Sequence, residues 1–245
     1  MKQSKLYSLL SNDNRLQILS ILSSNPSRFS DIQKALKISS PELARQISRL
    51  TEGLLIEKSG DYYTLTQLGG LVEDAAQLTA YLSEAADYLS THDVSPIPVH
   101  LLRTLDSLSE THVLPSMYNL LDTLKAKVST VKTRYWDLSD DYPSLLLGTV
   151  EELLDEGVEV RVLYPRETLE RARREVNAGI LNRILVKTLP AVNVTVVVSD
   201  SFAMLGLPDR NGSIDRQHYL FGESPRFIDW CEAFFLYSWD HAEIV

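Results

Sequence analysis

Cysteine is almost absent from this chain of 245 residues, in which Cys231 is the only one. A single cysteine cannot form a disulfide within the chain, and it cannot supply the thiolate cluster of a structural zinc site. The histidines do not replace it, because none has the HxxxH spacing that places two metal ligands on one helix face. The sequence therefore predicts neither a metal site nor a cofactor. The histidines are scattered along the chain, at His92, His100, His112, His218 and His241.

Long apolar runs are also missing. Apolar residues make up 44% of the chain, but none of their runs approaches the length that crosses a bilayer. The first 15 residues contain no apolar core of the length found in signal peptides. We therefore expect a cytoplasmic protein without a membrane partner.

Two common catalytic signatures are absent as well. The chain has no glycine-rich phosphate loop, and it has no GxSxG nucleophile motif. Acidic residues gather at 140–141 and 151–156, but their positions before and along one amphipathic helix indicate a solvated face rather than a metal cluster. The expectation is that the chain is not an enzyme.

The most informative stretch covers residues 28–66. Ser30 is a candidate cap for a first helix, and Ser40 followed by Pro41 favours the start of a second helix after a short break. Gly53 can end this second helix in a left-handed conformation, and a Gly60-Asp61 turn separates two short strands. Together with a preceding helix over residues 11–25, this order predicts a winged helix-turn-helix.

The second helix of this motif is the expected recognition helix. Leu43, Ile47 and Leu50 recur at helical spacing and predict its buried face. On the outer face, arginine can pair with guanine and glutamine with adenine, so we expect Arg45 and Gln46 to contact bases. In isolation, Arg45 and Arg49 would indicate only a solvated helix face, but the surrounding motif favours DNA binding. The predicted DNA-binding residues are Ser40, Pro41, Glu42, Arg45, Gln46, Arg49 and, in the wing, Lys58.

Charge is distributed unevenly along the chain. The overall net charge is −9, but residues 1–66 carry +3 and the remainder carries −12. The basic end can approach phosphate while the acidic remainder stays away from it. Because +3 is a small charge for a DNA-binding domain, we expect binding to depend on dimerisation.

A long helix is predicted directly after the wing, over residues 66–90 with Thr66 as its cap. Its apolar residues alternate spacings of four and three, which is typical of a coiled-coil seam and predicts a homodimer. The alternative is that the same residues are buried against their own domain. The seam consists of Leu71, Ala75, Leu78, Leu82, Ala85 and Leu89.

Pro96 and Pro98 end the helical region. The predicted organisation is therefore a DNA-binding domain at 1–66, a dimerisation helix at 67–92 and an α/β domain at 93–245. In the last of these, helices are expected at 100–108, 115–126, 142–156 and 167–178, with a final helix opening at Ser224-Pro225. Strands are expected at 111–114, 130–136, 158–164, 184–189, 192–199, 202–207 and 218–221.

The α/β domain also suggests a ligand site. Open α/β sheets hold ligands in the crevice at their strand ends, and an aromatic platform with an arginine suits a small anionic effector. The alternative is that the aromatic residues are core packing and that the arginine pairs with Glu159 or Asp137. The candidate effector-binding residues are Tyr135, Trp136, Arg161 and Tyr164.

Two parts of the chain resemble known families. The first part resembles the winged helices of arsenic-repressor-type regulators of archaea and bacteria. The resemblance is carried by residues 16–22, SSPELARQISRL and GLLIEKSGDYYTLTQLG. GTVEELLDEGVEVRVLYP and the segment from VNVTVVV to the final helix resemble the effector domain of archaeal regulators of methanogenesis and filament growth. This second resemblance implies a core of phospholipase D-like fold and control of metabolic genes in an archaeon.

The catalytic motif of phospholipase D is nevertheless missing. These enzymes use a His-x-Lys pair, but His218 is followed by Tyr219 and Leu220, and the other histidines lack the lysine too. The expected fold class is α+β, with a winged helix, a long dimerisation helix and a phospholipase D-like domain without catalytic motif. The expected function is a DNA-binding transcription regulator that senses a small molecule. The alternatives are a degenerate phosphodiesterase or nuclease and an adaptor whose winged helix binds protein.

Overall fold

The computed structural model describes residues 2–114, 117–142 and 146–244 of the chain, which divides into two compact units at 1–80 and 81–245. The boundary between the units lies within the helix Gln67–Glu84. It falls between the domain boundaries predicted at 66/67 and 92/93. No helix of the described residues combines the length and the apolar content needed to span a membrane.

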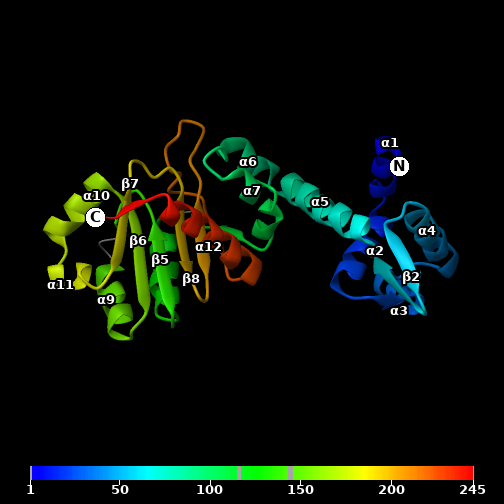
Figure 1. The fold of residues 1–245 in the computed structure, drawn as a ribbon, viewed down its shortest axis with the longest axis horizontal. Coiled ribbons are helices and arrows are strands. Elements are labelled where there is room, and N and C mark those ends of the chain that lie inside the picture. The colour runs from blue at the N-terminus through cyan, green and yellow to red at the C-terminus, as the bar shows by residue number, and fades with distance from the viewer. Residues whose placement is uncertain (1, 115–116, 143–145, 245) are drawn as a thin grey trace. The chain divides into compact units, whose positions relative to one another are not determined.

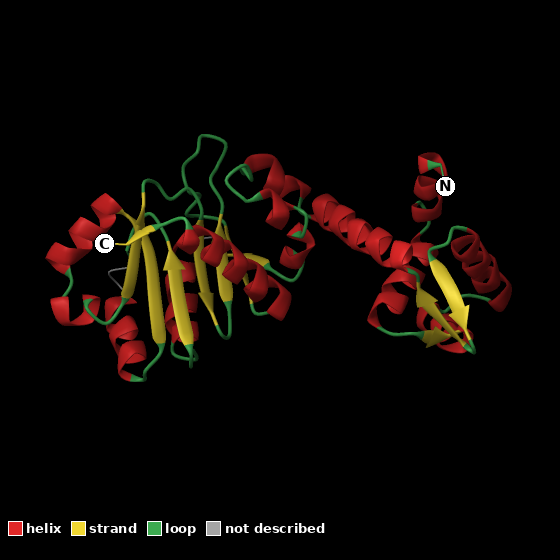
Figure 2. Ribbon diagram, viewed as in Figure 1, coloured by secondary structure: helices red, strands yellow, loops and turns green. Residues whose placement is uncertain are grey.

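The first unit combines helices with a small antiparallel sheet of three strands, in the order β1-β3-β2 (Figures 1 and 2). Strand β1 lies between the second and third helices, and the hairpin of β2 and β3 follows the fourth. The predicted order of helix, turn, helix and hairpin is present, and an additional helix, α1, precedes it. The core contains Ile18, Ile32, Leu43 and Leu50, all fully buried. The elements are α1 (Gln3–Leu10), α2 (Asp13–Ser24), β1 (Ser27–Arg28), α3 (Phe29–Leu36), α4 (Ser40–Glu52), β2 (Ile56–Ser59) and β3 (Tyr62–Leu65).

Two predicted helix starts need correction. Helix α3 begins at Phe29, before Ser30, because the Asp31 side chain accepts a hydrogen bond from the Arg28 amide (3.4 Å). Helix α4 is capped by Ser39 rather than Ser40, since the Ser39 hydroxyl accepts the Glu42 amide (3.4 Å).

The end of α4 also differs from the prediction. Gly53 has φ −80°, and the left-handed residue is Leu54 with φ 59°. Glycine at position 53 instead leaves room for the Leu9 side chain, which would have to shift because a Cβ there would lie 2.5 Å from its Cδ1.

The long helix after the wing is interrupted. The Gly69 amide donates to the Thr66 hydroxyl (2.9 Å), which confirms the predicted cap. However, Ala85 (φ −87°, ψ 8°) separates α5 (Gln67–Glu84) from α6 (Ala86–Thr91). The helix predicted over 100–108 is likewise two short pieces, α7 (Val99–Leu102) and η1 (Leu105–Leu108).

The second unit is built on a sheet of eight strands in the order β11-β7-β6-β5-β8-β9-β10-β4. Only the pairs β5–β6 and β6–β7 are parallel, and the remaining pairs are antiparallel. The strands are β4 (His112–Leu114), β5 (Arg134–Leu138), β6 (Glu159–Pro165), β7 (Leu185–Leu189), β8 (Thr195–Ser199), β9 (Ala203–Gly206), β10 (Tyr219–Gly222) and β11 (Glu243–Ile244).

Helices cover both faces of this sheet. Helices α9, α10 and α11 pack on one face of the parallel part, and α12 packs across β5, β8 and β9 on the other (Figure 1). The Ser224 hydroxyl accepts the Phe227 amide (3.3 Å), which confirms the predicted start of α12. Parts of the helices predicted at 115–126 and 142–156 lie outside the described residues. The helices are α8 (Met117–Val128), α9 (Leu147–Asp155), α10 (Arg166–Glu175), α11 (Ala178–Leu181) and α12 (Pro225–Asp240).

Candidate nucleic-acid interface and effector site

Helix α4 has the two faces that its sequence predicts. Leu43 and Leu50 are fully buried and Ile47 is nearly so, which fixes the inner face. The outer face begins at the N-terminus of the helix, where backbone N–H groups and the helix dipole favour negatively charged partners such as phosphate. Its exposed side chains are Ser40, Pro41, Ala44, Arg45, Ser48 and Arg49, with Glu42 half-buried.

Gln46 does not belong to this outer face, so its prediction as a base reader is wrong. It is only 2% exposed, and its Oε1 accepts a hydrogen bond from Arg15 Nη1 (2.7 Å). Its amide nitrogen donates to the carboxylate of Glu42. With both ends of the amide engaged inside the protein, Gln46 fixes α4 against the start of α2.

Arg15 is a buried cation that was not predicted from the sequence. It is 4% exposed and donates from Nε to the Leu9 carbonyl (2.5 Å) and from Nη2 to the Ser8 carbonyl (2.6 Å), besides its bond to Gln46. Burial, followed by the nearby charges of Arg49 and Arg45, lowers the pKa of Arg15. The signal in the sequence was its spacing, because Arg15 shares one face of α2 with the apolar residues Ile18, Leu19 and Leu22.

Arg45 and Arg49 are the cations that α4 presents to solvent. The Arg45 side chain is 61% exposed and forms an ion pair with Glu42. The hydrogen bond from Gln46, together with the charge of Arg45, lowers the pKa of the Glu42 carboxyl, so this carboxylate is ionised at neutral pH. Arg49 is exposed and has no ion pair among the described residues. Arg49 is therefore free to meet a phosphate, whereas Arg45 would first exchange Glu42 for a new partner.

The wing adds a second group of cations. Lys58 is exposed on β2, and its Nζ lies 5.8 Å from the centre of the Tyr63 ring on the paired strand. Arg28 is exposed on β1 and lies 4.9 Å from the centre of the Tyr62 ring. The sequence did not indicate Arg28, because the strand that brings it beside the hairpin has only two residues.

The predicted dimer seam is only partly exposed in this chain. Leu71 is 69% exposed and Leu82 is 42% exposed, while Leu78 and Leu89 are half-buried. Burial of the seam against its own domain is therefore wrong for Leu71 and Leu82. Dimerisation stays a prediction.

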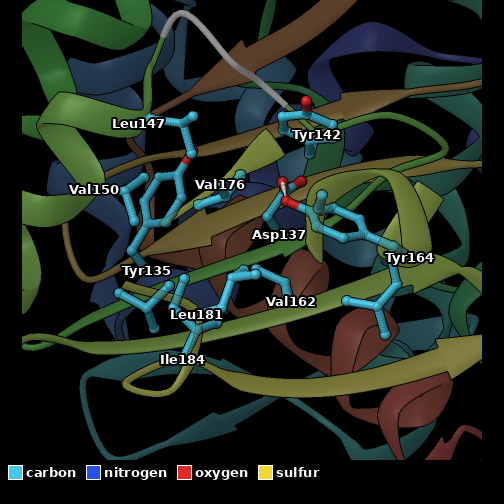
Figure 3. Close-up of a pocket in the computed structure, with 13 residues that line it drawn as sticks. Tyr135, Asp137, Tyr142, Leu147, Val150, Val162, Tyr164, Val176, Leu181 and Ile184 are labelled. Atoms are coloured by element: carbon cyan, nitrogen blue, oxygen red, sulfur yellow. Dashed lines mark hydrogen bonds between the residues drawn. The ribbon is translucent and has the colours of Figure 1, made fainter. Parts of the chain in front are cut away.

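The four predicted effector-binding residues do not form one site. Successive side chains of a strand point to opposite faces of the sheet. Tyr135 and Tyr164 therefore point toward helices α9 to α11 (Figure 3), whereas Trp136 and Arg161 lie on the α12 side. Because these residues lie on opposite faces of the sheet, the prediction that they share one crevice is wrong.

Tyr135 and Tyr164 line a cavity of about 30 Å³, together with Asp137 and apolar side chains of the covering helices (Figure 3). The Tyr164 hydroxyl donates to Asp137 Oδ2 (2.9 Å). Burial raises the pKa of the Asp137 carboxyl to about 7, and Asp140 and Asp141 add to this effect. No basic side chain is among the lining residues that the structure describes. The cavity thus suits an apolar molecule with one polar group better than an anion.

On the opposite face, Arg161 is already paired. Its guanidinium donates from Nε to Glu159 Oε1 (2.9 Å) and from Nη2 to Oε2 (3.1 Å), as one of the alternatives above expected. It also lies 4.6 Å from the ring centre of Trp136 and 5.4 Å from that of Trp239. With its charge offset by Glu159, Arg161 is a poor receptor for an anionic effector.

Two family models match the sequence. The model of the HVO_A0261 N-terminal domain matches residues 3–87, and that of the methanogenesis regulatory protein FilR1, middle domain, matches residues 117–241. No curated protein matches the chain.

Several solved structures are similar over large parts of the chain. TrmBL2, described as an archaeal chromatin protein with a novel mode of DNA binding, has 13% identity and a TM-score of 0.47 over 100% of both chains. Nuc, a phospholipase D family member from Salmonella typhimurium, has 9% identity and a TM-score of 0.37 over 51% of this chain and 90% of its own. An O-methyltransferase family protein from Burkholderia thailandensis has 12% identity and a TM-score of 0.28 over 76% of this chain and 61% of its own. Each TM-score is below 0.5, so we assign no fold from them, and the phospholipase D-like fold stays a prediction.

Proposed function

Because the chain belongs to the family defined by the middle domain of the methanogenesis regulatory protein FilR1, we propose that it is a DNA-binding transcription regulator. The observation that carries the proposal is the outer face of α4, which presents Arg45 and Arg49 from a helix whose other face is fixed by Leu43 and Leu50. Such a helix can enter the major groove with its N-terminal part leading. TrmBL2, a chromatin protein, is said to bind DNA, and we extend that property to this chain as part of the proposal.

The contacts divide by chemistry. Arg45 is the candidate base reader, since a guanidinium can make two hydrogen bonds to guanine. Arg49 on the helix, and Lys58 and Arg28 beside the wing, are the candidate phosphate contacts. Glu42 holds Arg45 in the free protein and can accept from cytosine once Arg45 has moved.

The test uses duplexes selected from a random library by the full-length protein, with affinities measured by fluorescence anisotropy over a range of salt concentrations. Arg45→Ala should cost about 1–3 kcal/mol on the selected duplex and little on random DNA. Lys58→Ala and Arg49→Ala should weaken both alike and lower the salt slope by about one. Arg174→Ala, which removes an exposed arginine of α10, serves as the charge-matched control.

Equal losses of Arg45→Ala on both duplexes would remove its role in specificity. Failure of the wild-type chain to bind any duplex at low salt would favour the adaptor function instead. Cleavage of the duplex during these measurements would favour the degenerate nuclease.

The regulator is proposed to act as a homodimer held by α5. The supporting observation is the exposure of Leu71 and Leu82 on one helix, which would leave apolar surface in water if the chain stayed alone. Replacing Leu78 and Leu82 together by aspartate should give a folded monomer by light scattering, because the interface would bury unpaired carboxylates. Val99→Asp is the control, since Val99 is 67% exposed elsewhere. A dimer that survives the double change would move the interface to another surface.

The sheet unit is proposed to sense an uncharged or weakly polar metabolite in the cavity beside Asp137, with no catalysis. The cavity of about 30 Å³ is large enough for only a water molecule or two, so a ligand must displace side chains of α9 to α11. Binding and conformation are then coupled, as a sensor requires. A coupling that changes DNA affinity about five- to 150-fold is typical.

A metabolite screen by thermal shift tests this proposal. A true effector should lose most of its effect on Asp137→Asn, which alters the polar group of the cavity. It should keep its effect on Arg161→Ala, which changes the opposite face of the same strands. The reverse pattern would return the site to Arg161, and hits that leave DNA affinity unchanged would separate ligand binding from regulation.

A further inference from the structure

Two histidines that are far apart in the sequence meet around one carboxylate. His92 follows the last turn of α6, and Asp215 and His218 lie in the segment between β9 and β10. His92 Nε2 lies 3.2 Å from Asp215 Oδ2, and His218 Nδ1 lies 2.8 Å from the same oxygen. One candidate ligand atom from each of the three residues lies within 4.8 Å of the others. The fold therefore brings together two histidines that are scattered along the sequence.

The orientation of His92 is fixed by its surroundings. Its side chain is 4% exposed and its ring stacks on Tyr88 with centroids 3.9 Å apart. Nδ1 lies 2.8 Å from the Tyr88 carbonyl oxygen, which can only accept, and 3.1 Å from the Thr91 hydroxyl. Because that hydroxyl donates to the same carbonyl (2.9 Å), we assign the proton to Nδ1. Such a bond to a backbone carbonyl is how metal-bound histidines are usually held.

This assignment leaves Nε2 with an unshared electron pair that faces the Asp215 carboxylate. Two electron-rich atoms 3.2 Å apart repel one another unless a positive charge lies at the site. The charge can be a second proton on the imidazole or a metal ion bound by both groups. A tetrahedral zinc site with bonds of about 2.0–2.1 Å has ligand atoms about 3.3 Å apart. The separation of His92 Nε2 from Asp215 Oδ2 (3.2 Å) is close to this value, that of His218 Nδ1 from the same oxygen (2.8 Å) is shorter, and all three atoms lie within 4.8 Å of one another.

We propose that His92, Asp215 and His218 bind a divalent transition metal of the zinc class. Two imidazoles and a carboxylate are donors that suit zinc, and they differ from the hard oxygen set of magnesium or calcium. The His218 side chain is 49% exposed, so the ion has a path from solvent and a water molecule can complete its coordination.

The ion would join two segments that already touch. The Asp93 amide donates to the Pro208 carbonyl (2.9 Å), and the backbones of His92 and Asp209 form an isolated antiparallel β-bridge. A metal held by His92 on one side and by Asp215 and His218 on the other would fasten the end of α6 to the β9–β10 segment. This site is separate from the Asp137 cavity and independent of the proposed DNA binding.

The test is isothermal titration of the full chain with zinc chloride after treatment with a chelator. The wild type should bind one ion per chain. Changing a second-shell residue typically costs 10- to 100-fold in metal affinity, so loss of a direct ligand in His218→Ala or Asp215→Asn should cost at least about 100-fold. His100→Ala, which removes another exposed histidine of the same unit, should change affinity less than about threefold.

A second measurement guards against a misfolded variant. Cobalt(II) bound by the wild type should give the intense visible absorption of a tetrahedral site, and zinc should displace it. Absence of saturable zinc binding, or equal affinities for wild type and His218→Ala, would overturn the proposal. The cluster would then be only a hydrogen-bonded contact between the two segments.

Discussion

Asp137 and Glu159 lie on neighbouring strands of one sheet, yet their carboxyl groups behave in opposite ways. Asp137 faces the apolar cavity under α9 to α11, and burial raises its pKa to about 7. Glu159 lies on the other face, where hydrogen bonds from Arg161 and then Trp136 outweigh burial and lower its pKa. The comparison teaches that burial decides for Asp137, where the hydrogen bond from Tyr164 does not offset it, whereas the cationic partner decides for the more exposed Glu159.

The largest effect should come from a buried charge whose partners are complete. Arg15 donates to two carbonyls and to Gln46, so Arg15→Ala would leave several buried acceptors without a donor. We expect a loss of about 3–5 kcal/mol in the stability of the first unit. Urea unfolding followed by circular dichroism would measure this loss. The unfolding transition followed by tryptophan fluorescence should match that of wild type, because all three tryptophans belong to the second unit: Trp136, Trp230 and Trp239.

Arg49→Ala is the control for Arg15→Ala, because it removes an exposed arginine from the same unit and should change stability by less than about 0.5 kcal/mol. Similar losses in both variants would mean that general charge, rather than the buried hydrogen bonds, is responsible.

The second prediction concerns pH and Asp137. The folded-state pKa of about 7 exceeds the ordinary value of 3.8, so the folded protein holds this proton more tightly than the unfolded chain. Stability from this group is complete below pH 3.8 and is lost as pH rises through 7. At about 1.4 kcal/mol per pH unit between these values, the full effect approaches about 4 kcal/mol.

Asp137→Asn removes the titration while keeping a similar shape. Urea unfolding followed by tryptophan fluorescence should therefore show that the variant gains stability relative to wild type between pH 5 and pH 8. A constant difference across this range would contradict the raised pKa of Asp137.

The third prediction separates two neighbours on α4. Gln46→Ala should destabilise the first unit by about 1–3 kcal/mol, since Arg15 loses a buried partner, but it should leave the preference between selected and random duplexes unchanged. Arg45→Ala should leave the stability of the first unit nearly unchanged, because its side chain is 61% exposed, and should reduce the preference for the selected duplex. Anisotropy and urea unfolding on both variants provide the measurement, and a changed sequence preference in Gln46→Ala would restore it as a base reader.

The sequence predicted α4 better than the sheet for a physical reason. One face of α4 is solvated, so Leu43, Ile47 and Leu50 stand out at helical spacing among polar residues. Strands β5 and β6 are covered on both faces, so Tyr135 and Trp136 are both buried and no alternation tells which side each one faces. The prediction for Gln46 failed because its partner, Arg15, is 31 residues away in the sequence and meets it only in the folded unit. The meeting of His92 with His218 depends in the same way on the tertiary fold.

The smallest effect should come from the pair on the α12 face. Glu159 and Arg161 have side chains 42% and 23% exposed, so solvent screens their attraction. A double-mutant cycle with Glu159→Gln and Arg161→Ala should give a coupling below about 1 kcal/mol at neutral pH, and less in high salt. Because the pKa of Glu159 is lowered, this coupling is fully present above the ordinary carboxyl pKa and is lost as pH falls through the lower pKa of the folded state. The sign is opposite to that of Asp137, so unfolding of both sets of variants at pH 4 and pH 8 compares the two faces directly. A coupling that grows toward acid pH would mean that Arg161 is held by another partner.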